Sequence, residues 1–371
     1  MDRILVTGLY RSGTTLLQKI LDMHPEINII EGGVFPFFKS LDCLFLKYSD
    51  SNIIDRPLCI EPQISDQDYK DIFDKVNFNK SNIFELMTKI RMRIDKGSKT
   101  DYARMCPTSK WFDYLESIIH QGNSKKILEK IYESIHLYRG SRPVTYTGFK
   151  ECLLDQFIEP LINCYKDRIK IVQLIRDPRA ILASRNYGFF SDIRTEGKKH
   201  PLLLVAYMWR NSVRYKNILT VKYPDNFYSV KYESLINNNY GVVKDICKFL
   251  IVEFFPFLLD HNKFKDENGD SWKANTSFKQ KSTGFLTASL IKWMKILPRD
   301  TLGAIEYLCA PEMLQAGYRP ILSDEEQFAC FVNYQEDTDT MKEWVKKFDL
   351  ILDHRNKQRE IARRATFDTT L

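Results

Sequence analysis

The chain has 371 residues, 44% hydrophobic and 13% aromatic, which is enough to build the core of one large domain or of two. This composition excludes a disordered chain, a collagen-like fibre and a small disulfide scaffold. The net charge of +7, from 55 basic and 48 acidic residues, permits an anionic ligand without requiring a nucleic acid.

The cysteines and the N-terminal residues indicate in which cellular compartment the protein is expected. The eight cysteines contain no C-x-x-C pair, so we expect reduced, mostly buried thiols. Charged Asp2 and Arg3 follow Met1, and the next apolar run is short, which is not a signal-peptide pattern. The most apolar stretch, Phe249 to Leu259, is shorter than the ~20 residues of a membrane-spanning helix. We therefore expect no transmembrane segment and a cytoplasmic location.

The N-terminal pattern predicts a strand, a tight turn and a helix. Ile4 to Val6 is an apolar run, Gly8 to Gly13 forms the turn, and Thr14 to Met23 has helical apolar spacing. A second strand is expected over Ile27 to Ile30, followed by a helix from Val34 to Tyr48.

The following region, from about residue 50 to residue 143, is polar and lacks strand signals. We interpret it as a helical insertion between strands. Further strands are predicted at Val144 to Lys150, Ile169 to Ile175 and Asn226 to Val230, with helices at Leu153 to Tyr165 and Gly241 to Leu250. This alternation predicts an α/β fold with three layers: a P-loop-like parallel sheet flanked by helices.

The last fifty residues have a different composition. Residues 323–339 are acidic, and Met341 to Ala365 is basic with a helical pattern. We predict an α/β domain over residues 1–320 and, over 321–371, an acidic linker and a basic helical extension. The extension is interpreted as a solvated helix packed on the domain through Trp344, Val345, Phe348 and Leu352, or alternatively as a docking helix for a partner or an acidic substrate.

Residues Gly8 to Thr15 have the GxxxxG spacing of a phosphate-binding loop, but Thr14 stands where a Walker loop has lysine. A glycine-rich turn that opens a helix directs backbone N–H groups and the helix dipole at one point, where a phosphate or a sulfate would bind. Arg11 would add a permanent cation, and Ser12, Thr14 and Thr15 add hydroxyl groups. The missing lysine disfavours a Mg-ATP kinase.

A second segment, Ile171 to Arg185, places Arg176 at the carboxyl end of a buried strand. Ligands bind at this edge of parallel sheets. Arg176 could equally form a structural ion pair. Asp177 and Pro178 fit the N-cap and the first position of the helix that follows.

Together these two segments resemble the PAPS-dependent sulfotransferases, whose donor is 3′-phosphoadenosine-5′-phosphosulfate. RSGTTLL, at residues 11–17, is similar to the family's 5′-phosphosulfate loop, and Arg176 with Ser184 is similar to its 3′-phosphate motif. The segments Tyr146 to Glu151, Val230 to Leu235, Ser277 and Lys292-Trp293 extend the resemblance, which covers residues 1–320. RSGTTLLxxxLDxHPEI is most similar to the tyrosylprotein and bacterial carbohydrate-type branches.

The resemblance implies a site and a donor. Arg11 and Lys150 would stabilise the charge that develops on transfer, and Ser12, Gly13, Thr14 and Thr15 would bind the 5′-phosphate. Arg176 and Ser184 would bind the 3′-phosphate, with Ser277 as a further donor. PAPS would be the co-substrate and 3′,5′-bisphosphate (PAP) the product, and no metal is expected because a sulfuryl group carries less charge than a phosphoryl group.

Glu31 is the predicted catalytic base because it ends the second strand near the loop. It could instead cap the next helix or pair with a lysine, and His24 is the alternative base. The tyrosylprotein branch has paired glutamates where this chain has Glu31-Gly32, which argues against protein-tyrosine sulfation. The acceptor is therefore expected to be a carbohydrate, a glycolipid or another small molecule; a kinase and a catalytically inactive scaffold are the alternatives from other classes.

Overall fold

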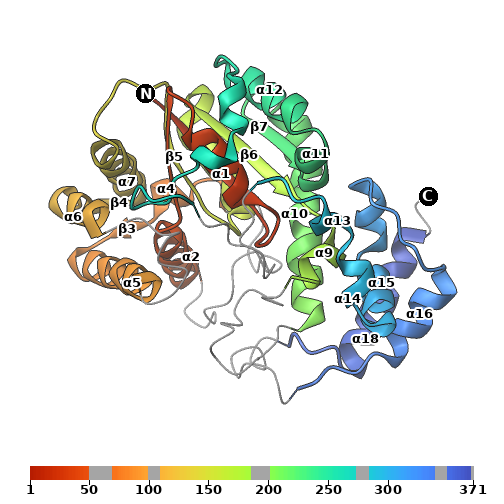
Figure 1. Ribbon diagram of the computed structural model, residues 1–371. Coiled ribbons are helices and arrows are strands. Elements are labelled where there is room, and N and C mark those ends of the chain that lie inside the picture. Colours follow the sequence, from red (N-terminus) through yellow and green to blue (C-terminus); the bar gives the residue numbers. More distant parts are fainter. Residues whose placement is uncertain (50–68, 99–108, 185–200, 273–283, 339–348, 369–371) are drawn as a thin grey trace.

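Five parallel strands form the centre of a computed structural model, which describes residues 1–49, 69–98, 109–184, 201–272, 284–338 and 349–368 (Figure 1). The sheet has the order β2-β5-β1-β6-β7. Its strands are β1 (Asp2–Gly8), β2 (Ile27–Glu31), β5 (Tyr146–Lys150), β6 (Ile169–Ile175) and β7 (Phe227–Lys231). All five strands were predicted from the sequence, and the parallel α/β class is confirmed.

Alternating side chains of β1 divide the core between the two faces of the sheet. Ile4 and Val6 pack with α1 (Thr14–Asp22), α11 (Tyr232–Asn237) and α12 (Asn239–Leu250). Leu5 packs in the other cluster, with helices α2 (Phe35–Ser49), α7 (Ser124–Tyr138), α8 (Ile158–Tyr165) and α10 (Leu202–Lys222). The sheet is therefore covered on both faces, as the continuous apolar run of β6 predicts.

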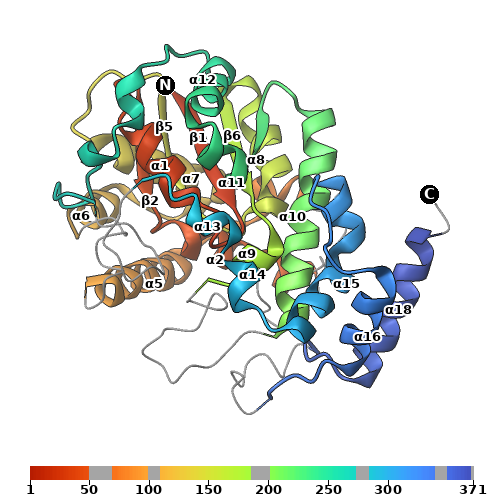
Figure 2. The same cartoon turned by 45° about the vertical axis from the view of Figure 1, so that its right-hand side comes forward.

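The region predicted as a helical insertion contains α4 (Ile72–Lys75), α5 (Lys80–Ser98), α6 (Ser109–Ile118) and α7. The prediction that it lacks strands is wrong in one detail. Strands β3 (Asn77–Phe78) and β4 (Gly122–Asn123) form a short antiparallel pair, in which Phe78 is buried in the core. Figures 1 and 2 show these helices at the opposite end of the molecule from the C-terminal helices α15, α16 and α18.

The remaining helices follow β6 and complete the C-terminal half. They are α9 (Pro178–Leu182), α13 (Ala288–Ile291), α14 (Trp293–Ile296), α15 (Arg299–Gln315), α16 (Asp324–Asn333) and α18 (His354–Asp368). Asp177 and Pro178 open α9 as predicted, since the Asp177 side chain accepts from the N–H of Arg179. Single turns of 3-10 helix lie at Asp155–Phe157, Lys166–Arg168, Pro256–Leu259 and His261–Lys263.

The acidic residues predicted to form a linker instead begin a helix. Ser323 and Glu326 form a reciprocal capping box at the start of α16, and the helix buries Phe331. Acidic side chains in the first turn interact favourably with the positive end of the helix dipole. The acidic composition thus favours this helix start.

Two ion pairs, one of them buried, join α18 to the rest of the chain. Arg210 of α10 contacts Glu360 at 2.6 Å, and Arg363 contacts Glu312 of α15 at 2.9 Å. Leu352, just before α18, is buried, whereas Trp344, Val345 and Phe348 lie outside the described residues. Helix α18 therefore packs on its own chain.

The six described cysteines are free thiols, and four of them are buried. Cys59 and Cys106 lie outside the described residues. None of the helices in the described residues is both long and apolar enough to cross a membrane.

Glu336 joins two segments that are distant in sequence. Its carboxylate accepts from the N–H of Leu202, at the start of α10, at 2.6 Å and from the N–H of Leu352 at 2.8 Å. Burial raises the pKa of Glu336 to about 7 from its ordinary 4.5, although these two N–H groups and the charge of Lys357 lower it. In the folded protein the neutral form of Glu336 is therefore favoured below about pH 7.

We expect this carboxyl group to make stability depend on pH. Because its folded pKa is raised, its contribution is fully present below the unfolded pKa near 4.5 and is lost as the pH rises through 7. The wild type should lose roughly 2–3 kcal/mol of unfolding free energy between pH 5 and pH 8, relative to Glu336→Gln. Denaturant unfolding of both proteins at both pH values measures this; parallel pH profiles would contradict it.

Candidate functional site

The loop between β1 and α1 has the backbone of an anion site. Arg11 adopts a φ of 64° and Gly13 a φ of 96°, both in the left-handed region. Helix α1 begins at Thr14 with no side-chain cap and no acidic residue in its first turn. The N–H groups and the positive dipole of this helix end are therefore available to an anion.

Gly13 also permits a close approach to Tyr232. A Cβ at Gly13 would lie 2.3 Å from the Tyr232 ring. The same ring lies under Arg176, whose guanidinium carbon is 4.3 Å from the ring centre. Tyr232 thus packs against both the loop and the arginine.

The hydroxyl groups predicted to bind phosphate contact the protein itself. Ser12 donates to the carbonyl of Leu9, Thr14 lies 3.6 Å from the sulfur of Cys152, and Thr15 donates to Glu31 at 2.7 Å. In this arrangement the backbone N–H groups, more than the hydroxyls, are directed to an anion.

Arg176 lies beside the loop, as its place after β6 predicts. Its guanidinium donates to the carbonyl of Arg11 at 2.7 Å and to that of Ser289 at 3.0 Å. Its own carbonyl accepts from the indole of Trp209 at 2.8 Å. Arg176 therefore holds the loop against α13, a positioning contact that the sequence did not reveal.

Lys150 and Glu31 meet at the carboxyl edge of the sheet. They are register partners at the ends of β5 and β2, and their side chains form an ion pair at 3.2 Å. Both residues are buried. The lysine pairing that the sequence left open for Glu31 is present, while its second carboxylate oxygen, Oε2, has no hydrogen-bond partner in the described residues.

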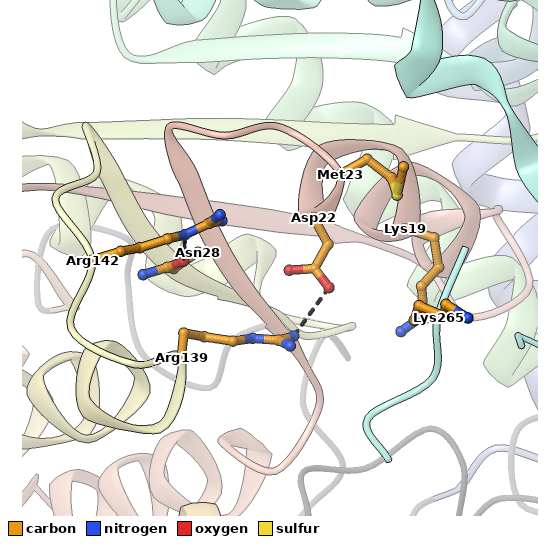
Figure 3. A pocket seen from close by; sticks show the side chains of 7 residues that line it. All are labelled: Lys19, Asp22, Met23, Asn28, Arg139, Arg142 and Lys265. Atoms are coloured by element: carbon orange, nitrogen blue, oxygen red, sulfur yellow. Dashed lines mark hydrogen bonds and ion pairs between the residues drawn. The ribbon is translucent and has the colours of Figure 1, made fainter. Parts of the chain in front are cut away.

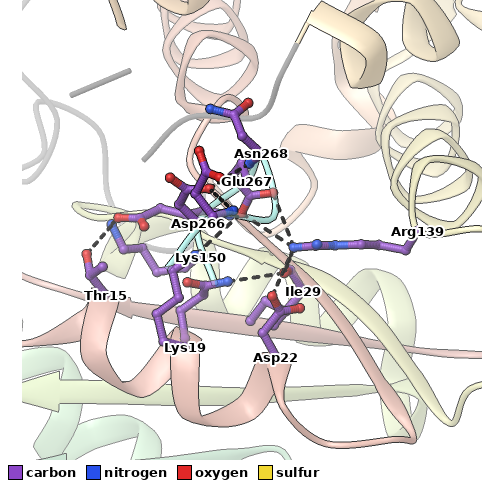
Figure 4. A network of polar contacts seen from close by, with 12 residues as sticks. Thr15, Lys19, Asp22, Ile29, Arg139, Lys150, Asp266, Glu267 and Asn268 are labelled. Carbon is purple, nitrogen blue, oxygen red and sulfur yellow. Dashed lines mark hydrogen bonds and ion pairs between the residues drawn. The ribbon is translucent and has the colours of Figure 1, made fainter. Parts of the chain in front are cut away.

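A polar network extends from this pair beneath the loop (Figure 4). The N–H of Glu31 donates to Glu267 at 3.3 Å. Glu267 also contacts Lys19 at 3.7 Å and Arg139 at 3.2 Å, and Arg139 contacts Asp22 at 3.1 Å. Glu267 was missed in the sequence because it lies 236 positions from Glu31.

The other predicted residues differ in their surroundings. Ser184 follows α9, and its buried hydroxyl has no hydrogen-bond partner among the described residues. Ser277 lies outside the described residues. Trp293 is buried with Arg179 stacked on it at 4.0 Å, as expected for a core aromatic residue.

His24 is held by backbone groups on both ring nitrogens. Nδ1 accepts from the N–H of Glu26 at 3.1 Å, so Nε2 carries the proton that is donated to the carbonyl of Glu253 at 2.8 Å. The ring is fully buried. This arrangement gives His24 a structural role.

Two further carboxylates, Glu233 and Asp177, support the strand end near Arg176. Glu233 accepts from the N–H of Asp177 at 3.1 Å and from the hydroxyl of Tyr318 at 2.8 Å. Asp177 pairs with Arg179 at 2.7 Å. Burial and the neighbouring Glu233 raise the pKa of Tyr318, which keeps its hydroxyl protonated as the donor.

Comparison with known structures returned sulfotransferases. The sulfotransferase domain from the curacin biosynthetic pathway has a TM-score of 0.49 and 16% identity, covering 86% of this chain and 98% of that chain. The sulfotransferase domain from the Synechococcus PCC 7002 olefin synthase has a TM-score of 0.46 and 18% identity, covering 85% and 94%.

Sequence comparison returned carbohydrate sulfotransferases. Carbohydrate sulfotransferase 6 of Homo sapiens is 26% identical over 187 residues, which are 46% of this chain and 47% of that protein. Carbohydrate sulfotransferase 3 of Tetronarce californica is 27% identical over 177 residues, or 44% and 39%. The chain thus spans less than half the length of these relatives. Residues 159–313 of this chain match the family model of the sulfotransferase domain.

Proposed function

We propose that the protein transfers the sulfuryl group of PAPS to a hydroxyl group of a carbohydrate-containing acceptor by in-line displacement. The observation that carries the proposal is the Lys150–Glu31 pair at 3.2 Å, next to the uncapped start of α1. A cation, a carboxylate and an anion-binding helix end thus converge at the carboxyl edge of a parallel sheet. The carbohydrate acceptor is inferred from the names of the relatives.

The residues present fit a nucleotide with phosphates at two positions. The N-terminal N–H groups of α1 and Arg11 would hold the 5′-phosphate. The buried hydroxyl of Ser184, which lacks a partner among the described residues, would donate to the 3′-phosphate near Arg176. A buried donor without an acceptor is unfavourable, so a phosphate oxygen would satisfy Ser184.

When bound, PAPS supplies an activated sulfuryl group whose transfer leaves negative charge on the bridging phosphate oxygen. Lys150 is assigned to that charge, since preorganised cations stabilise it in a water-poor site. Glu31 is assigned as the base that receives the acceptor's proton at Oε2, the carboxylate oxygen without a hydrogen-bond partner in the described residues. Thr15 and Lys150 bind Oε1 and so orient the carboxylate.

Labelled PAPS offered to a panel of acceptors tests the acceptor class. The panel contains neutral and sulfated oligosaccharides, a glycolipid and a tyrosine peptide. We expect label to enter a carbohydrate hydroxyl. Transfer to the tyrosine peptide alone would contradict the acceptor class, and Mg-ATP-dependent phosphorylation would contradict the reaction.

Arg176→Ala should weaken binding of the 3′,5′-bisphosphate product by ~1.5 to 3 kcal/mol, because a charged hydrogen bond is lost. The same variant loosens the loop by removing the donor to the Arg11 carbonyl. Calorimetry with the 3′,5′-bisphosphate and with adenosine 5′-monophosphate separates the two effects. We expect the variant to lose more binding free energy for the bisphosphate than for the monophosphate. Equal losses for the two nucleotides would mean that Arg176 supports the loop and does not bind the 3′-phosphate.

A further inference from the structure

A basic pocket lies at the other end of helix α1 from the glycine loop. It has a volume of about 300 Å³ and is lined by Lys19, Asp22, Met23, Asn28, Arg139, Arg142 and Lys265 (Figure 3). These residues come from the end of α1, the start of β2, the segment after α7 and the segment before Glu267. None of them belongs to the site proposed for sulfuryl transfer.

The charge of this pocket favours an anion. Among the described residues that line it, four side chains are cationic and one, Asp22, is a carboxylate. Glu267 lies behind it and contacts Lys19 at 3.7 Å and Arg139 at 3.2 Å. Two carboxylates therefore face four cations, which leaves an excess of two positive charges.

Two buried donors of the pocket lack hydrogen-bond acceptors among the described residues. The side chain of Lys19 is 1% exposed, and its Nζ donates no hydrogen bond within the described residues, since its ion pair with Glu267 is 3.7 Å long. Asn28 is also buried, and its Nδ2 is unsatisfied. Its Oδ1 accepts from Arg142 at 3.1 Å, which orients the amide. Buried donors that lack acceptors are unfavourable unless a ligand supplies them.

We propose that this pocket binds one oxyanion group, a sulfate or a carboxylate. Its oxygens accept from Lys19 and Asn28, and Lys265 and Arg142 supply additional positive charge. The group is either a free anion or one carried by an acidic saccharide; the pocket recognises the same chemistry in both. Glu267 contacts Lys19 of this pocket and also accepts from the N–H of Glu31. It therefore links the pocket to the proposed site of transfer.

Selenate, an isostere of sulfate, locates the site directly. Crystals of the full chain soaked in selenate are expected to show an anomalous selenium peak between Lys19 and Asn28, separate from any peak at the glycine loop. The absence of a peak in the pocket, at a concentration that fills the glycine loop, would overturn the proposal. This outcome does not depend on the donor nucleotide, so it is distinguishable from failure of the proposed function.

A matched pair of lysines provides the control. Lys265 and Lys263 are exposed on the same segment, but only Lys265 lines the pocket. Lys265→Met should lower selenate occupancy in the pocket and Lys263→Met should not; equal occupancy in both would count against the site. Lys19→Met should weaken selenate binding by about tenfold or more, and if that variant does not fold, the Lys265 and Lys263 pair decides.

Competition identifies the source of the anion. Glucose 6-sulfate added with selenate should remove the selenium peak at a lower concentration than inorganic sulfate does if the pocket takes a saccharide-borne group. Inorganic sulfate is the stronger competitor if the ligand is a free anion. Failure of both to displace selenate would contradict an oxyanion site.

Discussion

Lys150→Ala is expected to reduce sulfate transfer by about 10²- to 10³-fold, the loss typical when one preorganised charge donor is removed from an active site. Lys150 is buried at the end of β5, so its ammonium group is fixed near the start of α1 and is poorly screened by water. The binding of the bisphosphate product should change far less than the rate. Steady-state transfer from labelled PAPS and calorimetry on the same variant measure the two effects.

Lys231 provides the matched control for Lys150. It ends the neighbouring strand β7 at the same edge of the sheet, and its Nζ donates to the carbonyl of Gly317 at 2.9 Å. Lys231→Ala removes a strand-end cation without touching the Lys150–Glu31 pair, so transfer should remain near that of the wild type. Similar rates in both variants would remove Lys150 from the mechanism.

Glu31→Gln should lower the rate of transfer by about 10²- to 10⁴-fold, the range for loss of a positioned general base. Glutamine keeps the size of the side chain and can still accept from Thr15, so the β2 edge should remain folded. Because the variant lacks the base, its rate of transfer should no longer fall at acidic pH as the wild-type rate does. The pH dependence of transfer for wild type and variant measures this.

Glu151 serves as the control carboxylate for this experiment. It follows Lys150, is buried and pairs with Arg93 at 2.9 Å. Glu151→Gln should retain the acidic limb of the pH profile even if it lowers stability. If Glu31→Gln behaves like Glu151→Gln, Glu31 is a partner of Lys150 and not the base.

The sheet could be predicted because its strands are short apolar runs followed by turn residues. Glu31 and Lys150 were both placed at the ends of predicted strands, but a lysine partner for Glu31 was only one of the alternatives, because the order of the strands was not predicted. Helix α10 was not predicted: it buries consecutive residues from Leu202 to Ala206 and even Arg210, so it lacks the single apolar stripe by which a surface helix is recognised. The buried guanidinium of Arg210 donates to Glu360, which is 150 positions further along the sequence.

The contacts that the loop residues make also could not be predicted from the sequence. The motif gave Ser12, Thr14 and Thr15 as anion donors, but nearby backbone, Cys152 and Glu31 compete for their hydroxyls. Arg176 was placed at the correct edge, yet the carbonyls that accept from it come from two separate segments. Such contacts depend on the packing of distant elements, which spacing in one sequence does not encode.

Calorimetric titration with the 3′,5′-bisphosphate product tests the central claim most directly. The uncapped start of α1, together with Arg176 and Ser184, predicts that this nucleotide binds about tenfold or more tightly than adenosine 5′-monophosphate, the ratio for one charged hydrogen bond. It should also bind more tightly than ATP with magnesium. Equal affinity for the bisphosphate and the monophosphate, or a preference for Mg-ATP, would contradict the account.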